Sequence, residues 1–127
     1  MSLIDWASWA TVGGVKVSDY LIHIPNEAKR SKAAGARAKR MGLKVGVSDL
    51  FLAVPAGGFS GLWIELKAPA TAGHRAGKPT QAQLDWLDRM AAAGYCTCLC
   101  WGWMAAKSAI EDYLGAVHSV PNREGGG

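Results

Sequence analysis

The sequence predicts an α/β protein in which helices flank a mixed central sheet. Stretches of strand length alternate with helical patterns along the chain, and two apolar runs flank a Gly-rich turn near its middle. With 127 residues, 50% of them hydrophobic, the chain suits one domain with one core. We expect this domain to span residues 1–115 and a flexible tail to follow over residues 116–127, where Gly is frequent.

The N-terminal third predicts a helix, a strand and a second helix. Residues 3–10 carry Trp6 and Trp9 three apart, so both indoles are expected to pack from one helical face. Residues 20–24 are largely apolar and stop at a proline, as a strand does. Residues 26–41 are rich in Ala and basic residues and end at a glycine, which favours a helix.

The central stretch predicts a β-hairpin. Residues 46–54 and 62–67 are the two apolar runs, and each carries an acid where a buried strand normally has none. Asp49 lies near the start of the first run. Glu65 and Lys67 lie two apart on the second run and therefore share one face of the strand.

Pairing of the two runs would bring Asp49 near Glu65. Two close carboxylates repel each other unless one is protonated or a cation lies between them, and Lys67 adds a further positive charge. This is the chemistry of a divalent-metal site that acts on a phosphate. The alternative is that Asp49 caps a turn while Glu65 and Lys67 form a solvated pair on an edge strand.

The C-terminal half predicts a loop, a helix, a strand and a final helix. Residues 68–79 are rich in Ala, Gly and Pro and are expected to form a mobile loop. Thr80 has the character of an N-cap for an amphipathic helix over residues 81–93. Residues 95–101 are apolar on both faces, which is typical of a central strand, and residues 103–114 follow as a helix.

Charge, hydropathy and cysteine spacing indicate the cellular compartment and the kinds of binding partner to expect. The net charge of +4 and the isoelectric point near 9.1 permit a polyanionic partner. No stretch approaches the roughly 20 apolar residues of a membrane span, and no secretory signal is evident, so we expect a cytoplasmic protein without a membrane partner. Cys96, Cys98 and Cys100 alternate on one face of a strand, which favours small core residues over a disulfide or a zinc site.

Basic residues gather in two places, the segment 26–41 and the loop 68–79. Acids are nearly absent from the first segment, so ion pairs within a helix do not account for its charge. A surface that contacts phosphates and a solvated helix face remain equal alternatives. The candidate DNA contacts are Lys29, Arg30, Lys32, Arg37, Lys39, Arg40, Arg75 and Lys78.

Several motifs occur together in a fixed order. They are Ile24-Pro25-Asn26, Gly46-Val47-Ser48-Asp49-Leu50, Gly61-Leu62-Trp63-Ile64-Glu65-Leu66-Lys67, Lys78-Pro79-Thr80 with Gln83 and Trp86-Leu87, and Gly94-Tyr95. Over roughly residues 20–114 this series resembles the VRR-NUC family, in particular its small stand-alone members of phages and bacteria. The family is a branch of the PD-(D/E)XK nuclease superfamily, so the resemblance implies a restriction-endonuclease-like core.

The resemblance also implies a site and an activity. Asp49, Glu65 and the carbonyl of Leu66 would bind Mg²⁺ or Mn²⁺, and Lys67 and Gln83 would complete the catalytic set, with Gln81 as the other register for the glutamine. The implied activity is metal-dependent cleavage of DNA, selective for branched structures such as Holliday junctions, by a homodimer. The alternatives are a flap or nicking nuclease and a nucleic-acid-binding module that has lost catalysis.

One departure from the family concerns the first helix. Family members usually carry a Glu there, and in this chain that position would fall at or before Met1. Asp5 and Glu27 are the candidate substitutes. Trp6, Trp9 and Trp103 lie outside the predicted sheet and are the candidate dimer contacts, because aromatic residues are enriched at interfaces.

Overall fold

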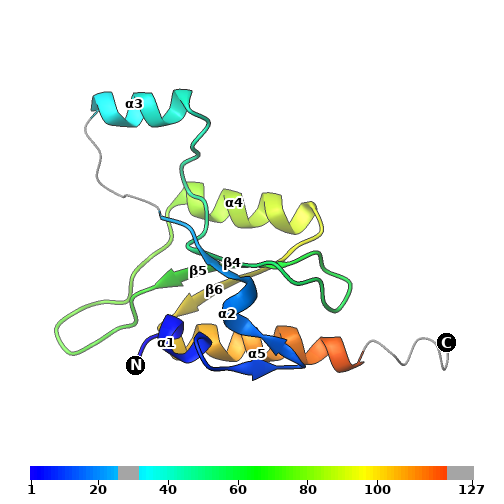
Figure 1. Ribbon diagram of the computed structural model, residues 1–127. Coiled ribbons are helices and arrows are strands. Elements are labelled where there is room, and N and C mark those ends of the chain that lie inside the picture. Colours follow the sequence, from blue (N-terminus) through cyan, green and yellow to red (C-terminus); the bar gives the residue numbers. More distant parts are fainter. Residues whose placement is uncertain (26–31, 120–127) are drawn as a thin grey trace.

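The computed structural model describes residues 1–25 and 32–119, and Figure 1 shows their arrangement. A four-stranded sheet has the order β3-β4-β5-β6, with β3 at Leu21–His23, β4 at Leu50–Leu52, β5 at Leu62–Lys67 and β6 at Cys96–Trp101. β3, β4 and β5 pair antiparallel, whereas β5 and β6 pair parallel. The predicted mixed sheet is therefore confirmed.

Helices cover both faces of this sheet. α4 (Gln81–Ala92) lies on one face, and α5 (Trp103–Ser119) lies on the other together with α1 (Leu3–Ala7) (Figure 1). Thr80 caps α4 as predicted, since its side chain accepts a hydrogen bond from the backbone N–H of Gln83. None of the described helices is long and apolar enough to cross a membrane.

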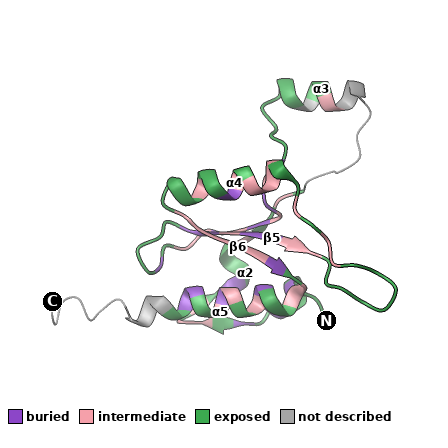
Figure 2. Cartoon of the chain, turned by 180° about the vertical axis from the view of Figure 1, so that it is seen from behind, coloured by how far each residue is buried: buried purple, intermediate pink, exposed green. Residues whose placement is uncertain are grey.

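The predicted hairpin is confirmed, and its register sets the two faces of the sheet. Leu50 pairs with Ile64, and Phe51 pairs with Trp63. Because side chains alternate along a strand, Ile64 points into the core between the sheet and α5, while Trp63 points toward α4. There the rings of Trp63 and Trp86 are in contact, with centroids 5.3 Å apart. Figure 2 shows buried residues concentrated between the sheet and α5.

The first strand of the hairpin is shorter than the predicted run of residues 46–54, and the chain turns at Gly46, well before β4 begins. This glycine has φ +87°, a conformation that side chains disfavour. A Cβ atom at position 46 would lie only 2.5 Å from the carbonyl carbon of Ala82. The absence of a side chain thus lets the segment before β4 lie directly against the first turn of α4.

The strand β6 corrects one expectation. It is apolar on both faces, as predicted, but it lies at an edge of the described sheet and not at its centre. Both of its faces are apolar because α4 and α5 cover them. Cys96, Cys98 and Cys100 share the face toward α5, and Cys100 is buried there as a free thiol.

The N-terminal region also differs from the prediction. α1 ends at Ala7, so Trp6 is buried in the core while Trp9, beyond the end of the helix, is 65% exposed. Gly13 and Gly14 form the turn between two short strands, β1 (Thr11–Val12) and β2 (Val15–Lys16), which the helix α2 (Val17–Tyr20) follows.

The two remaining helices are α3 and the end of α5. α3 (Lys32–Arg40) stands apart from the sheet in Figure 1, and Gly42 follows its end with φ +89°. The first residues of the helix predicted over 26–41, residues 26–31, lie outside the described residues. α5 continues to Ser119, beyond the predicted end at residue 114 and through Gly115. The division into a domain and a tail at residue 115 stays a prediction.

Candidate active site

The two carboxylates of the hairpin lie side by side at one end of the sheet. Asp49 immediately precedes β4, and the register that pairs Leu50 with Ile64 continues to place Asp49 opposite Glu65. Asp49 Oδ2 accepts a hydrogen bond of 2.9 Å from the backbone N–H of Leu66. The predicted proximity of Asp49 and Glu65 is thereby confirmed, and a backbone contact holds Asp49 in place.

The carbonyl of Leu66 has the orientation that the predicted metal site requires. In an antiparallel ladder, the N–H and the C=O of one residue point toward the same neighbouring strand. Since the Leu66 N–H points toward Asp49, the Leu66 carbonyl points to the same side of β5. No β4 residue pairs with it there, because β4 begins only at Leu50. Asp49 and the Leu66 carbonyl are therefore directed at one region.

Glu65 is a carboxyl group that the fold keeps away from water. Its residue is 1% exposed, and its Oε1 atom has no hydrogen-bond partner among the described residues. Burial is the main cause that raises the pKa of Glu65 from its ordinary 4.5 to about 7, and the charge of Asp49 with a hydrogen bond to it adds to this effect. Without a cation, Glu65 therefore holds its proton up to neutral pH.

Lys67 lies beside this pair on the same face of β5. Its Nζ atom is 3.6 Å from Glu65 Oε2, and its side chain is 16% exposed. The positive charge of Lys67 lowers the pKa of Glu65, but burial and Asp49 outweigh it. The ammonium group of Lys67 is thus insufficient to keep Glu65 fully ionised at neutral pH.

Gln83 takes part in the start of α4. Its Oε1 atom accepts a hydrogen bond of 2.8 Å from the Thr80 N–H, while Thr80 Oγ1 accepts one of 3.1 Å from the Gln83 N–H. The cap engages the amide oxygen, so the side-chain NH₂ is the group that Gln83 could offer to a phosphate. Gln81 instead donates to Asp85 at 2.9 Å on the exposed side of α4.

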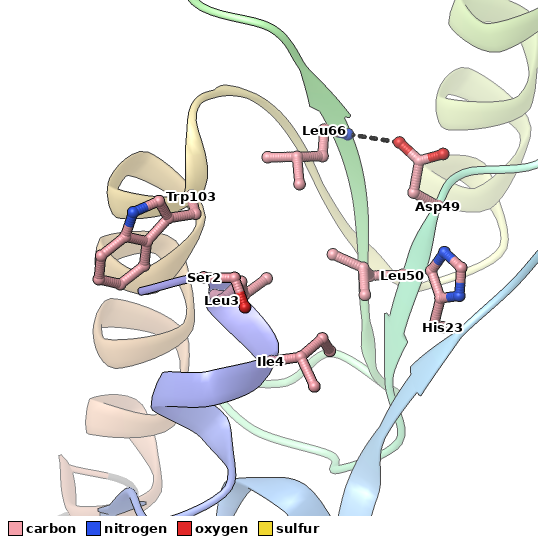
Figure 3. Close-up of a pocket in the computed structure, with 8 residues that line it drawn as sticks. All are labelled: Ser2, Leu3, Ile4, His23, Asp49, Leu50, Leu66 and Trp103. Atoms are coloured by element: carbon pink, nitrogen blue, oxygen red, sulfur yellow. Dashed lines mark hydrogen bonds between the residues drawn. The ribbon is translucent and has the colours of Figure 1, made fainter.

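A cavity of about 300 Å³ opens beside Asp49 (Figure 3). Its lining consists of residues from α1, β3, β4, β5 and α5, namely Ser2, Leu3, Ile4, His23, Asp49, Leu50, Leu66 and Trp103. His23, the last residue of β3, is exposed here. Sequence analysis missed this placement because it depends on the pairing of His23 with Leu50, which brings together distant parts of the chain.

The cavity also bears on the Glu that family members carry in the first helix. The N-terminus of α1 reaches the cavity through its N-cap residue, Ser2. Asp5, however, accepts a hydrogen bond of 3.0 Å from the Ser2 N–H and so caps its own helix. Asp5 is not among the cavity-lining residues, and Glu27 lies outside the described residues. Among the described residues, Asp5 is therefore not brought to Asp49.

The oxygen atoms at this end of the sheet fit a hard divalent cation. Two carboxylates and a carbonyl are ligands that Mg²⁺ and Mn²⁺ accept, with water completing the coordination. The unpartnered Oε1 of Glu65 and its raised pKa are what a bound cation would relieve. Within residues 1–25 and 32–119, no group of three or more His, Cys, Asp or Glu side chains is placed to hold a metal. The donors that the described residues offer here are Asp49, Glu65 and the Leu66 carbonyl.

The predicted DNA contacts divide into three groups. Arg37, Lys39 and Arg40 are exposed on α3, and Arg75 and Lys78 are exposed in the loop that follows β5. Lys32 is the first residue of α3. Lys29 and Arg30 lie outside the described residues.

A mixed sheet between helices, with Asp49 before one strand and Glu65 and Lys67 on the next, defines a restriction-endonuclease-like fold. Comparison with known proteins is consistent with this class. No protein-family model matches the sequence, and a search of curated proteins finds no match. A solved structure described as "VRR_NUC domain protein" is similar over 90% of this chain and 83% of its own, with 28% identity and a TM-score of 0.74. This similarity supports the resemblance of the sequence to the VRR-NUC family, and the chain has a nuclease-like fold.

Proposed function

We propose that this protein is a Mg²⁺- or Mn²⁺-dependent DNA endonuclease that hydrolyses phosphodiester bonds. The observation that carries the proposal is the buried Glu65, opposite Asp49 and 3.6 Å from the ammonium of Lys67. A structural ion pair would not need a second carboxylate, whereas phosphate chemistry needs both a cation site and a positive group beside it.

Each residue then has a defined task. Asp49, Glu65 and the Leu66 carbonyl would hold the cation, which supplies charge compensation on the phosphate and acidifies bound water. Lys67 orients the attacking water and stabilises negative charge that develops near it. The Gln83 NH₂ group hydrogen-bonds the water or a phosphate oxygen, while its oxygen remains in the helix cap.

The function is tested by nicking of supercoiled plasmid in Mn²⁺ or Mg²⁺ compared with EDTA. Nicking that needs the cation supports the nuclease. Binding of DNA without cleavage in either metal would support the alternative of a binding module, which is motivated by Asp5 capping its own helix and not facing Asp49. The natural substrate is addressed by a panel of junction, flap, fork and duplex DNA, where we expect the junction to be cut best.

The exposed basic residues of α3 are proposed to contact the DNA backbone. Changing Arg37, Lys39 and Arg40 together to Gln should weaken binding and reduce the slope of log K against log salt by about 2 to 3 units, because each phosphate contact contributes about 0.9. The slope is obtained from titrations in EDTA at several salt concentrations.

A control variant with two changed charges separates a local effect from a general loss of positive charge. Lys16 and Arg89 are exposed outside both proposed DNA-contact segments, so changing them to Gln should leave the slope near that of the wild type. An equal loss per charge in both variants would mean that α3 does not contact the DNA.

Cleavage of a four-way junction requires two cuts in opposed strands, and a homodimer with two-fold symmetry supplies two sites. Trp6 cannot be a contact of this dimer, because it is buried within the subunit. Trp103 is half-buried and lines the cavity, which leaves the exposed Trp9 as the stronger candidate. Light scattering at micromolar concentration should give twice the mass of the chain. A monomer that stays monomeric on a junction would favour a flap or nicking nuclease.

A further inference from the structure

Trp101 lies next to Lys67 on the face of the sheet that carries the proposed site. It is the last residue of β6 and pairs with Lys67 in the parallel register between β5 and β6. Paired residues of neighbouring parallel strands point to the same face, about 4.8 Å apart across the sheet. Trp101 is 41% exposed. An indole with an accessible surface is therefore the lateral neighbour of the proposed catalytic lysine.

Hydrogen bonds fix the indole of Trp101 and the backbone beside it. Its Nε1–H donates to the Gly77 carbonyl at 2.7 Å, and the Gly77 N–H donates to Ala68 O at 2.9 Å. The backbone beside the indole is held as well, since the Gly102 N–H donates to Lys67 O at 2.9 Å. The polar atom of the indole is thus satisfied, and its exposed surface is aromatic carbon.

Trp101 is also separate from the aromatic cluster under α4. The ring contacts of that layer join Phe51, Trp63, Trp86 and Tyr95 in the described part of the chain. Those rings pack the sheet against the helix, whereas Trp101 lies beside the loop that carries the exposed Arg75 and Lys78. A large exposed aromatic ring between a catalytic lysine and a basic loop is not accounted for by packing alone.

We propose that Trp101 stacks on an unpaired base next to the phosphate that is cleaved. The inference rests on the proposed nuclease function and adds a feature of its substrate, an unpaired nucleotide beside the cut, which a four-way junction offers only where a base pair at its branch point opens. Stacking of a base on an aromatic side chain contributes roughly 1–3 kcal/mol and needs an exposed base face, which a base within a duplex does not offer. Arg75 and Lys78 would contact the phosphates of the same strand.

A purely structural role is the competing explanation, since the hydrogen bond to Gly77 also anchors the loop. Trp101→Phe and Trp101→Leu separate the two roles. Both variants lose the indole N–H and hence the bond to Gly77, and both keep an apolar side chain of moderate size. They differ in the aromatic face, so a difference in binding between them reports stacking and not anchoring of the loop.

The experiment measures binding of a labelled single-stranded oligonucleotide by fluorescence anisotropy in EDTA. We expect Trp101→Leu to bind about 5- to 100-fold more weakly than Trp101→Phe, as the stacking energy implies. On an oligonucleotide of the same length made of abasic residues, the two variants should bind equally. Phe59→Leu is the control, because Phe59 is 43% exposed but lies in the turn between β4 and β5, at the other end of β5 from Lys67.

Equal binding of the Phe and Leu variants to the base-bearing strand would overturn the proposal, and so would an equal difference on the abasic strand. The measurement needs no turnover, so it can fail while metal-dependent cleavage is observed, and it can succeed while cleavage is absent. The wild-type protein must bind the base-bearing strand more tightly than the abasic one. If it does not, Trp101 is an anchor of the loop only.

Discussion

Replacing Asp49 by Asn or Glu65 by Gln is expected to abolish nicking of plasmid DNA in Mg²⁺. Each change removes one of the two carboxylates that face each other across the hairpin. Loss of a residue that only supports a metal ligand typically lowers metal affinity or activity by roughly 10- to 100-fold. Loss of a ligand itself should lower the activity by at least that factor. Binding should persist, because it depends on phosphate contacts and neither change removes a positive charge.

The same assay includes Lys67→Met, which should lower the cleavage rate by roughly 100- to 1,000-fold, as the loss of a single charge-stabilising donor does. Asp88→Asn is the matched control, because Asp88 is exposed on α4 and outside the site. Wild-type rates for both Asp49→Asn and Glu65→Gln would show that the site assignment is wrong. Equal loss of cleavage and of binding would point to misfolding, which thermal melting of the variants checks.

The metal-free protein is expected to lose stability as pH rises from about 4.5 to about 7, and the cause is Glu65. Unfolded, this carboxyl ionises near its ordinary pKa of 4.5, while in the folded chain burial and Asp49 raise the pKa to about 7. Between these values the folded state binds more protons than the unfolded state, so the free energy of unfolding falls with rising pH. Above pH 7 the full penalty is present, on the order of 3 kcal/mol.

Urea unfolding in EDTA between pH 4.5 and pH 8 measures this effect. Glu65→Gln removes the ionisation, so its stability relative to wild type should rise through that pH window and then level off. Asp88→Asn should instead follow the wild-type curve. Parallel curves for Glu65→Gln and wild type would contradict the raised pKa.

Metal binding is coupled to the same proton. A cation on Asp49 and Glu65 must displace the proton of Glu65, so added Mn²⁺ should stabilise the wild type strongly at pH 8 and weakly at pH 5.5. Glu65→Gln should lose most of this stabilisation at pH 8. The result would be independent of whether the protein cleaves DNA.

Local rules of the sequence were sufficient for the hairpin and for the grouping of Glu65 with Lys67. A Gly-rich turn between two apolar runs brings the strands together, and alternation along a strand places Glu65 and Lys67 on one face. The cap at Thr80 is also local, because its hydrogen bonds span three residues. These features depend on neighbours in the chain and could be predicted without a tertiary structure.

Other features depend on contacts between distant segments. Trp6 and Trp9 have the same local pattern, but α1 ends between them, so one is buried and the other exposed. β6 pairs with β5 in parallel only after the chain has crossed over through α4. This pairing puts β6 at the edge of the sheet and Trp101 beside Lys67. The pKa of Glu65 likewise depends on burial, which is set by the packing of the whole domain around one carboxyl group. Sequence spacing identifies the residues of this site, whereas the tertiary structure decides their protonation and their neighbours.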